Sequence, residues 1–134
     1  MSVLTPPAIP TPALRIIRIA LAAGALLFGC LGLWLAGQRS EPPSDPANLA
    51  KIVYISYGFS ALCAAGVFGV RTVRSRMAPA ARPQISLIGW ALAEASAMFG
   101  GVVQVLGGGI LPWVAGMLVI AFSWMQIPAD PEAE

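Results

Sequence analysis

Histidine is absent from this sequence of 134 residues, and charged residues make up only 10% of it. The absence of histidine removes the commonest general base and metal ligand, and two cysteines alone cannot complete a standard zinc or haem site. Because a soluble domain carries about a quarter charged residues, the low charge argues against an ordinary soluble globule. A formal net charge of +2 provides no basic face for nucleic acid. We therefore expect no metal, no cofactor, no nucleic-acid partner and no enzyme activity.

Apolar residues are abundant instead, at 57% of the chain, with a mean hydropathy of +0.78. A helix that spans a membrane needs about 20 mostly apolar residues. Four runs approach or reach this length, at residues 16–36, 52–70, 85–106 and 110–127. Of the 12 prolines only Pro112 lies inside a run, in its first turn, where proline is tolerated. The pattern predicts an all-α bundle of four transmembrane helices, arranged as two hairpins that pair the first helix with the second and the third with the fourth.

The remaining segments are short. Residues 1–14 carry no charge and four prolines, which is typical of a flexible tail. Residues 15–127 are expected to form a single membrane domain, because its loops are too short to fold alone. Residues 128–134 are expected to form a short acidic tail.

Arginines indicate the orientation of the spans. Arg15 and Arg18 flank the first run, and four more lie in the second loop, namely Arg71, Arg74, Arg76 and Arg82. The positive-inside rule then places the N-terminus and the second loop in the cytoplasm, and an even number of spans returns the C-terminus there. We expect a multi-pass protein of a bacterial inner membrane. The loop arginines could also attract anionic lipid headgroups, at about 1 kcal/mol each, or could serve only to fix the orientation.

Glu94 is the one acidic residue within the predicted hydrocarbon region. It lies about nine residues into its run, or about 14 Å at 1.5 Å per residue, near the midplane of a core about 30 Å thick. Burial in hydrocarbon favours the neutral form, so we expect Glu94 to be protonated. Ser60 on the second run lies at a similar depth and is the expected hydrogen-bond partner. An ionisable residue inside a membrane indicates a functional site by default.

Small residues recur about every four positions on two of the runs, a spacing that lets helices approach closely in lipid. The third run carries Gly89, Ala93, Ala97 and Gly101, and the second run carries Gly58, Ala61, Ala65 and Gly69. We expect both stripes to be helix-packing faces.

Residues 91–103, ALAEASAMFGGVV, resemble the carboxylate helix of the rotor-ring c subunit of rotary ATP synthases. The matching positions are Ala91, Glu94, Ala95, Phe99, Gly100, Val102 and Val103. This resemblance implies that Glu94 binds and releases a proton during rotation. The whole chain is also similar to small four-helix bacterial membrane proteins, a resemblance that implies no particular activity.

The leading functional interpretation is a non-catalytic membrane protein, either an accessory subunit of a larger complex or a self-associating bundle. Glu94 is then a buried interhelical group, and the partners are the lipid bilayer and other membrane-spanning chains. The first alternative is proton or ion translocation, with Glu94 and Ser60 at the binding site. The second is association with anionic lipid through the arginine-rich loop.

Overall fold

The computed structural model describes residues 9–41, 45–130 and 132. Within this part of the chain there are four α-helices, one short 3-10 helix and no strand, which confirms the all-α prediction. The elements are α1 (Thr11–Gly37), α2 (Pro46–Ser75), η1 (Pro79–Ala81), α3 (Arg82–Val105) and α4 (Leu111–Gln126).

Proline marks the start of every α-helix. The first or second helical position is Pro12 in α1, Pro46 in α2, Pro83 in α3 and Pro112 in α4. The fixed φ of proline suits the first turn, where its missing N–H removes no intrahelical bond. In α2 the Asp45 side chain also caps the helix, accepting a bond of 3.0 Å from the Asn48 N–H.

Three segments are long and apolar enough to cross a membrane, Thr11–Gly37, Pro46–Ser75 and Pro79–Val105. The fourth helix, α4, is equally apolar in character but has only 16 residues. Helices α1 and α2 extend beyond their predicted runs at both ends and α3 begins before its run, whereas α4 is slightly shorter than the predicted run 110–127.

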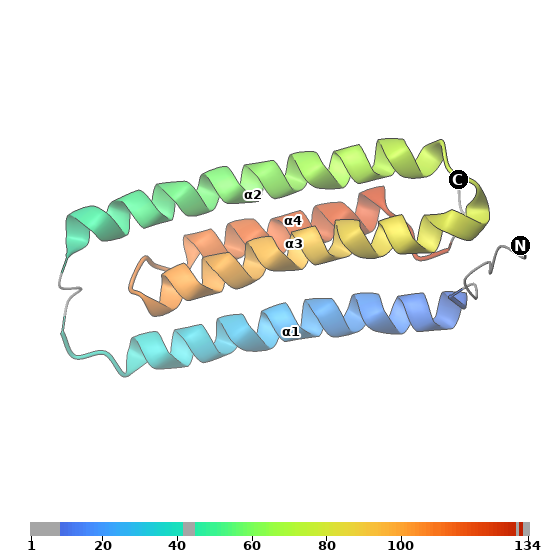
Figure 1. The fold of residues 1–134 in the computed structure, drawn as a ribbon. Helices are drawn as coiled ribbons and strands as arrows, with labels where there is room; N and C mark the ends of the chain where they lie inside the picture. The colour runs from blue at the N-terminus through green and yellow to red at the C-terminus, as the bar shows by residue number, and fades with distance from the viewer. Residues whose placement is uncertain (1–8, 42–44, 131, 133–134) are drawn as a thin grey trace, which may run out of the picture.

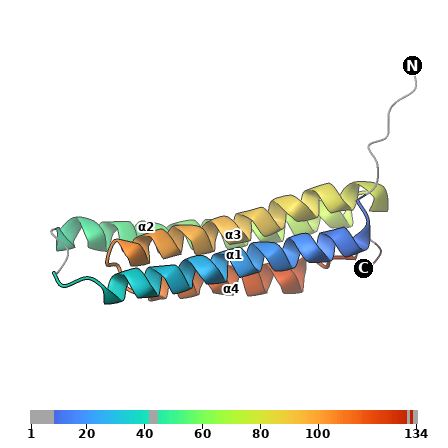
Figure 2. The same ribbon diagram turned by 90° about the horizontal axis from the view of Figure 1, so that it is seen from below.

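The helices run alongside one another with α3 in the middle (Figures 1 and 2). Contacts join α3 to each of the other three helices, and α2 also packs on α4. In contrast, α1 and α2 have no Cα atoms within 8 Å of each other in the described residues. The predicted pairing of the first two helices is therefore wrong, whereas α3 and α4 do form a closely packed hairpin. The physical reason is that α3 offers small residues on more than one side, so both α1 and α2 pack against it.

Trp113 ties α4 to α1. Its indole Nε1 donates a hydrogen bond of 3.1 Å to the Ala25 carbonyl, and its ring lies where a Cβ on Gly29 would stand. Only a residue without a side chain at Gly29 leaves room for the ring.

The beginning of α1, the end of α4 and the connection between α2 and α3 lie at the same end of the bundle (Figure 1). The opposite end carries the other two connections. This arrangement gathers the predicted cytoplasmic arginines at one end of the molecule.

The predicted tails differ from the structure. Of the proposed flexible segment 1–14, residues 1–8 lie outside the described part, and α1 already begins at Thr11, with Leu14 buried. At the other terminus the segment Ile127–Asp130, here called the strap, packs across the end of the bundle. Ile127 and Ala129 are buried, and the Ile127 side chain fills the space beside Gly89. Residues 131 and 133–134 of the predicted acidic tail lie outside the described part.

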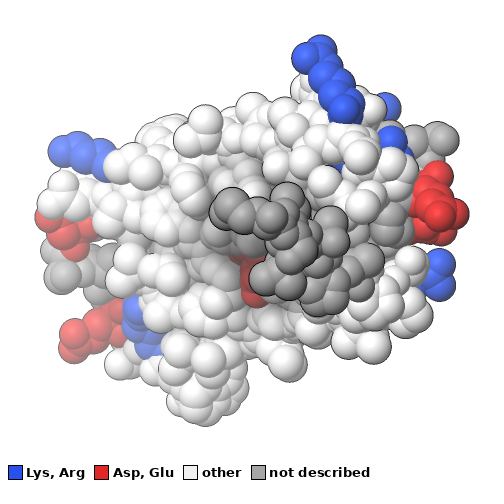
Figure 3. Space-filling view, turned by 45° about the vertical axis from the view of Figure 1, so that its right-hand side comes forward, with Lys and Arg blue, Asp and Glu red and all other residues white. Residues whose placement is uncertain are grey.

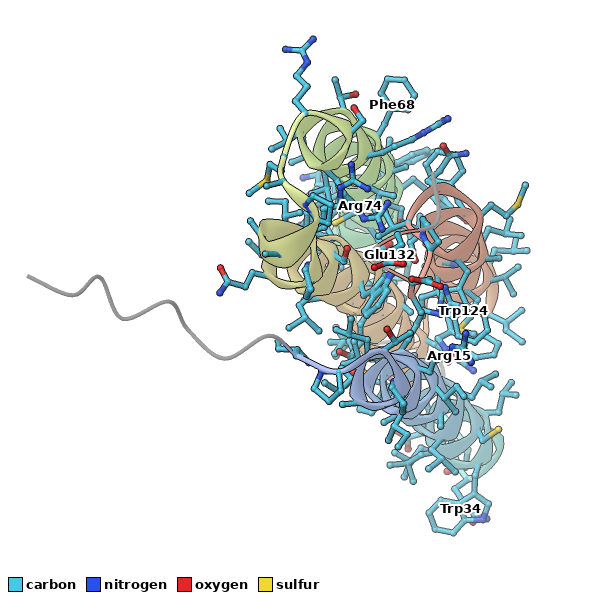
Figure 4. All side chains as sticks on the ribbon, turned by 90° about the vertical axis from the view of Figure 1, so that its right-hand side faces the viewer. Arg15, Trp34, Phe68, Arg74, Trp124 and Glu132 are labelled. Atoms are coloured by element: carbon cyan, nitrogen blue, oxygen red, sulfur yellow. The ribbon has the colours of Figure 1, made fainter. Side chains whose placement is uncertain are left out.

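Much of the surface is apolar, unlike that of a soluble protein. The buried polar side chains of the described residues are five serines (Ser56, Ser60, Ser86, Ser96 and Ser123), Gln104 and Arg74. Large apolar side chains face outward, among them Leu62, Leu118 and Met125, which are 68%, 66% and 81% exposed. In Figure 3 most of the coloured charged groups lie towards the two ends of the visible face. Figure 4 shows Phe68 and Trp34 pointing away from the bundle and Arg74 pointing into it.

Candidate functional site

The small-residue stripe of α3 lies inside the bundle. Gly89, Ala93, Ala97 and Gly101 are all buried. The closest approach is between α3 and α4, where a Cβ on Gly116 would lie 2.3 Å from the Cα of Ala97. Gly100 is equally tight, since its Cβ would lie 2.3 Å from the Pro112 carbonyl oxygen. Glycine is therefore required at this crossing for the two backbones to touch.

The small-residue stripe of α2 does not pack as expected. Gly58, Ala61, Ala65 and Gly69 are all exposed, and neither glycine would bring a Cβ within 4 Å of a neighbour. The inward face of α2 is instead formed by Ser56, Ser60, Cys63, Val67, Val70 and Arg74. This face places Ser60 beside Ser96 and Arg74 beside Ser86, and both pairs are joined by buried hydrogen bonds.

Glu94 lies on the side of α3 that faces α1. Its carboxylate Oε1 is 3.6 Å from the position that a Cβ on Gly24 would take, so the two helices meet at this point. The side chain is half-buried. Across the described residues its carboxyl group makes no hydrogen bond and no ion pair, and this leaves its oxygens available.

Ser60 is not the partner of Glu94. The Ser96 hydroxyl donates a hydrogen bond of 2.9 Å to the Ser60 oxygen, and both serines are buried. Ser60 contacts α3 on the side that faces α2, whereas Glu94 lies on the side of α3 that faces α1. The expected Glu94–Ser60 pair is therefore replaced by a serine pair that joins α2 to α3.

Gln104 is a buried polar residue that sequence reasoning missed. It is 2% exposed, and neither its amide nitrogen nor its amide oxygen has a hydrogen-bond partner in the described part of the chain. The amide lies against Gly32 of α1, since a Cβ there would be 3.3 Å from Gln104 Cδ. It lines an apolar pocket of about 310 Å³ that Arg39 and Glu41 border at the end of the bundle opposite the strap.

Replacing Gln104 by leucine is expected to raise the free energy of unfolding by about 1–2 kcal/mol. The substitution removes a buried donor and acceptor that have no partner, and such groups cost about 1–3 kcal/mol. The measurement is equilibrium unfolding of the purified variant in detergent. A lower stability than that of the parent protein would show that the amide is satisfied in the folded state.

The sequence suggested that the arginines of the second loop could attract lipid headgroups. In the structure most of them form hydrogen bonds with other residues of the protein. Arg74 is 1% exposed, and its guanidinium donates to Ser86 Oγ at 3.1 Å and to the Asp130 carbonyl at 2.8 Å. Arg82 donates to the Met77 carbonyl at 3.1 Å, and Arg71 bonds the amide oxygen of Gln126. Arg74 is therefore an internal structural residue, contrary to the suggestion that it contacts lipid headgroups. Arg76 remains exposed.

A second arginine, Arg18, is held by aromatic rings. Its guanidinium carbon lies 4.6 Å from the ring centroid of Trp124 and 5.7 Å from that of Trp90. Arg18 and the Trp90 indole both donate to the Ile127 carbonyl, at 3.4 and 3.3 Å. The strap thus receives bonds from α1, α2 and α3. An arginine placed one turn inside an apolar run was the sequence signal for this cluster, because such a residue needs nearby partners.

Metal chemistry has no support in the described residues, which contain no group of three His, Cys, Asp or Glu side chains that could hold an ion. Cys30 is exposed on α1 and Cys63 is buried on α2, and neither forms a disulfide. The chain matches no protein-family model, no curated protein and no solved structure.

Proposed function

We propose that the chain is an integral membrane protein with four spans, whose N- and C-termini lie in the cytoplasm of a bacterial cell. The observation that supports this most strongly is the apolar surface, where many large apolar side chains are exposed while the serines, Gln104 and Arg74 are buried. In lipid there is no water to satisfy outward polar groups, so they turn towards other helices. The three long apolar helices provide spans of sufficient length.

The helix proposed as the fourth span is α4. Its 16 residues extend about 24 Å at 1.5 Å per residue, slightly less than a hydrocarbon core about 30 Å thick. Because α4 lies closely along α3, a bilayer that surrounds α3 also surrounds α4. The strap continues from α4 to the end of the bundle and completes the crossing.

We assign the protein a non-catalytic role that depends on helix contacts with other chains, in the form of self-association through α2. The support is the exposed small-residue face of α2, formed by Gly58, Ala61, Ala65 and Gly69. Small residues of this spacing let two helices pack backbone against backbone in lipid. A role as an accessory subunit of a larger complex uses the same face with a different chain.

Cysteine cross-linking in native membranes tests this role. Both natural cysteines are first replaced by alanine, and Ala61→Cys is then compared with Leu62→Cys, its neighbour on the helix. Self-association through the small-residue face predicts an oxidised dimer for Ala61→Cys and little dimer for Leu62→Cys. Equal yields at the two positions, or no dimer at either, would contradict self-association through this face.

Proton translocation is the second candidate, and a specific observation favours it. A purely structural Glu94 should form an interhelical hydrogen bond, yet its carboxyl group makes none in the described residues, and Ser60 is bonded to Ser96. The carboxyl lies between α3 and α1 beside Gly24, where it could take up and release a proton. The resemblance of residues 91–103 to the rotor c-subunit helix implies the same role.

Dicyclohexylcarbodiimide, which attacks protonated carboxyl groups in apolar surroundings, distinguishes the two roles of Glu94. Translocation predicts rapid labelling in native membranes that falls as the pH rises, because an accessible carboxyl exchanges its proton. Mass spectrometry of the labelled peptide measures this, with Glu94→Gln as the unlabelled control. No labelling from about pH 5 to 9 would show a sealed carboxyl and exclude translocation through Glu94.

A further inference from the structure

We propose that a pocket between α1 and α4 binds the phosphate headgroup of an anionic phospholipid. The pocket has a volume of about 430 Å³ and lies beside the strap. Its lining residues are Arg15, Arg18, Ile19, Trp124, Pro128, Ala129 and Asp130. The proposal rests on the membrane location and orientation proposed above, which place this pocket at the cytoplasmic surface of the bilayer.

Two guanidinium groups supply the positive charge. Arg15 and Arg18 are three residues apart on α1, so they lie on the same face of the helix. Arg15 is exposed and makes no hydrogen bond or ion pair in the described residues. Arg18 has one long bond of 3.4 Å to the Ile127 carbonyl, and its Nε is buried without a partner. The donors of Arg15 therefore remain for an anion, with the charge of Arg18 beside them, and the planar guanidinium fork matches the geometry of phosphate oxygens.

The aromatic contacts fix one of these groups in advance. Arg18 stacks over Trp124 at 4.6 Å and also lies 5.7 Å from the Trp90 ring, which is buried. A guanidinium held in this way loses little conformational entropy when it binds a ligand. Figure 4 shows Arg15 and Trp124 on the same side of the bundle.

The acidic residue of the pocket does not neutralise the arginines. Asp130 forms no ion pair with Arg15 or Arg18 in the part of the chain that the structure describes. Its carboxylate oxygen instead accepts a bond of 3.0 Å from the Glu132 backbone N–H. The Asp130 carbonyl is also engaged, since it accepts from Arg74.

The walls of the pocket favour a lipid over a soluble phosphate. Ile19 is 60% exposed and Trp124 is 37% exposed, so both present apolar surface to the bilayer beside the arginines. Tryptophan is enriched at the level of the headgroups. An acyl chain can therefore run along Ile19 while the phosphate meets Arg15 and Arg18. We therefore assign the lipid contact to this pocket and not to the second loop, because Arg71, Arg74 and Arg82 of that loop are bonded within the protein.

The test is thermal unfolding of the full chain in a neutral detergent with added phosphatidylglycerol or phosphatidylcholine. Phosphatidylglycerol is expected to raise the unfolding temperature, and phosphatidylcholine to raise it much less. In Arg15→Gln, half-maximal stabilisation should need about five times more phosphatidylglycerol, the equivalent of about 1 kcal/mol per basic residue. Arg76→Gln, which removes an exposed arginine at the same end of the bundle, should leave the titration unchanged. Equal effects of the two lipids, or of the two variants, would overturn the proposal.

A second variant and a soluble competitor complete the test. Arg18→Lys keeps the charge but loses the planar stacking on Trp124, so its phosphatidylglycerol titration should also weaken. An unchanged titration in both Arg15→Gln and Arg18→Lys would overturn the site. Stabilisation by glycerol phosphate at the same concentrations would overturn the lipid as the ligand. Recovery of the chain in the membrane fraction without any lipid preference would reject this pocket alone, whereas recovery in the soluble fraction would reject the membrane location itself.

Discussion

Replacing Gly116 by alanine should lower the free energy of unfolding by about 3 kcal/mol, or prevent α4 from packing on α3. The added Cβ would lie 2.3 Å from the Cα of Ala97 and 2.7 Å from the carbonyl carbon of Ser96. Both atoms belong to the backbone and cannot rotate away, so the helices must separate. Separation would also disturb Gly100, which packs on Pro112 at the same crossing. Equilibrium unfolding in detergent measures the loss.

Gly37→Ala is the matched control. It is the exposed last residue of α1, outside the proposed association face, and a Cβ there would meet no atom within 4 Å. Alanine exceeds glycine in helix propensity by about 0.5–1 kcal/mol, so the control should be neutral or slightly stabilising. Equal destabilisation by the two substitutions would contradict the close contact assigned to α3 and α4.

Replacing Arg74 by methionine should cost about 3 kcal/mol and release the strap. The guanidinium donates to Ser86 and to the Asp130 carbonyl in a buried setting. Each hydrogen bond from a charged group contributes about 1.5–3 kcal/mol, and methionine fills a similar volume without any donor. Equilibrium unfolding gives the stability, and limited proteolysis at the strap reports its release separately.

Arg76→Met provides the comparison for this prediction, because Arg76 is an exposed arginine close to Arg74 in the sequence. It should change neither the stability nor the cleavage of the strap. If Arg74→Met left the strap as protected as in the parent protein, the bond from Arg74 to the Asp130 carbonyl would not be what holds the strap at the end of the bundle.

The helical segments could be predicted from the sequence because the length of an apolar run and the position of proline each depend on a single segment of the chain. A run of apolar residues needs a helix to satisfy its own backbone in lipid, and proline is tolerated only near the helix start. Both signals are present in each segment, for example at Pro46 and Pro112. The fold class followed from such local features, without knowledge of which helices touch.

The lateral arrangement of the helices could not be predicted in the same way. On α2 one stripe runs through Gly58 and Ala61, and another runs through Ser56 and Ser60. Both consist of small residues with helical spacing, so periodicity alone gave no reason to choose between them. The buried stripe is the one that carries hydroxyl groups, and Ser60 of this stripe bonds Ser96 of α3.

Only part of the candidate site could be predicted from the sequence, because the neighbours of each side chain also depend on how the helices pack. The depth of Glu94 follows from counting residues along one helix, but its neighbour depends on the rotation of α3 about its axis. That rotation directs Glu94 towards Gly24 of α1. The cluster around Arg18, Trp90 and Trp124 combines three helices and the strap, so no single segment revealed it.

The most direct test of the membrane architecture is the location of the C-terminus, measured with alkaline phosphatase and green fluorescent protein fused after Glu134 and expressed in a bacterial inner membrane. Alkaline phosphatase is active only outside the cytoplasm, and green fluorescent protein is fluorescent inside it. Four spans with a cytoplasmic N-terminus predict a fluorescent fusion and an inactive phosphatase. An active phosphatase with a dark fluorescent protein would place the C-terminus outside the cytoplasm and would contradict the proposed architecture of four spans with both termini in the cytoplasm.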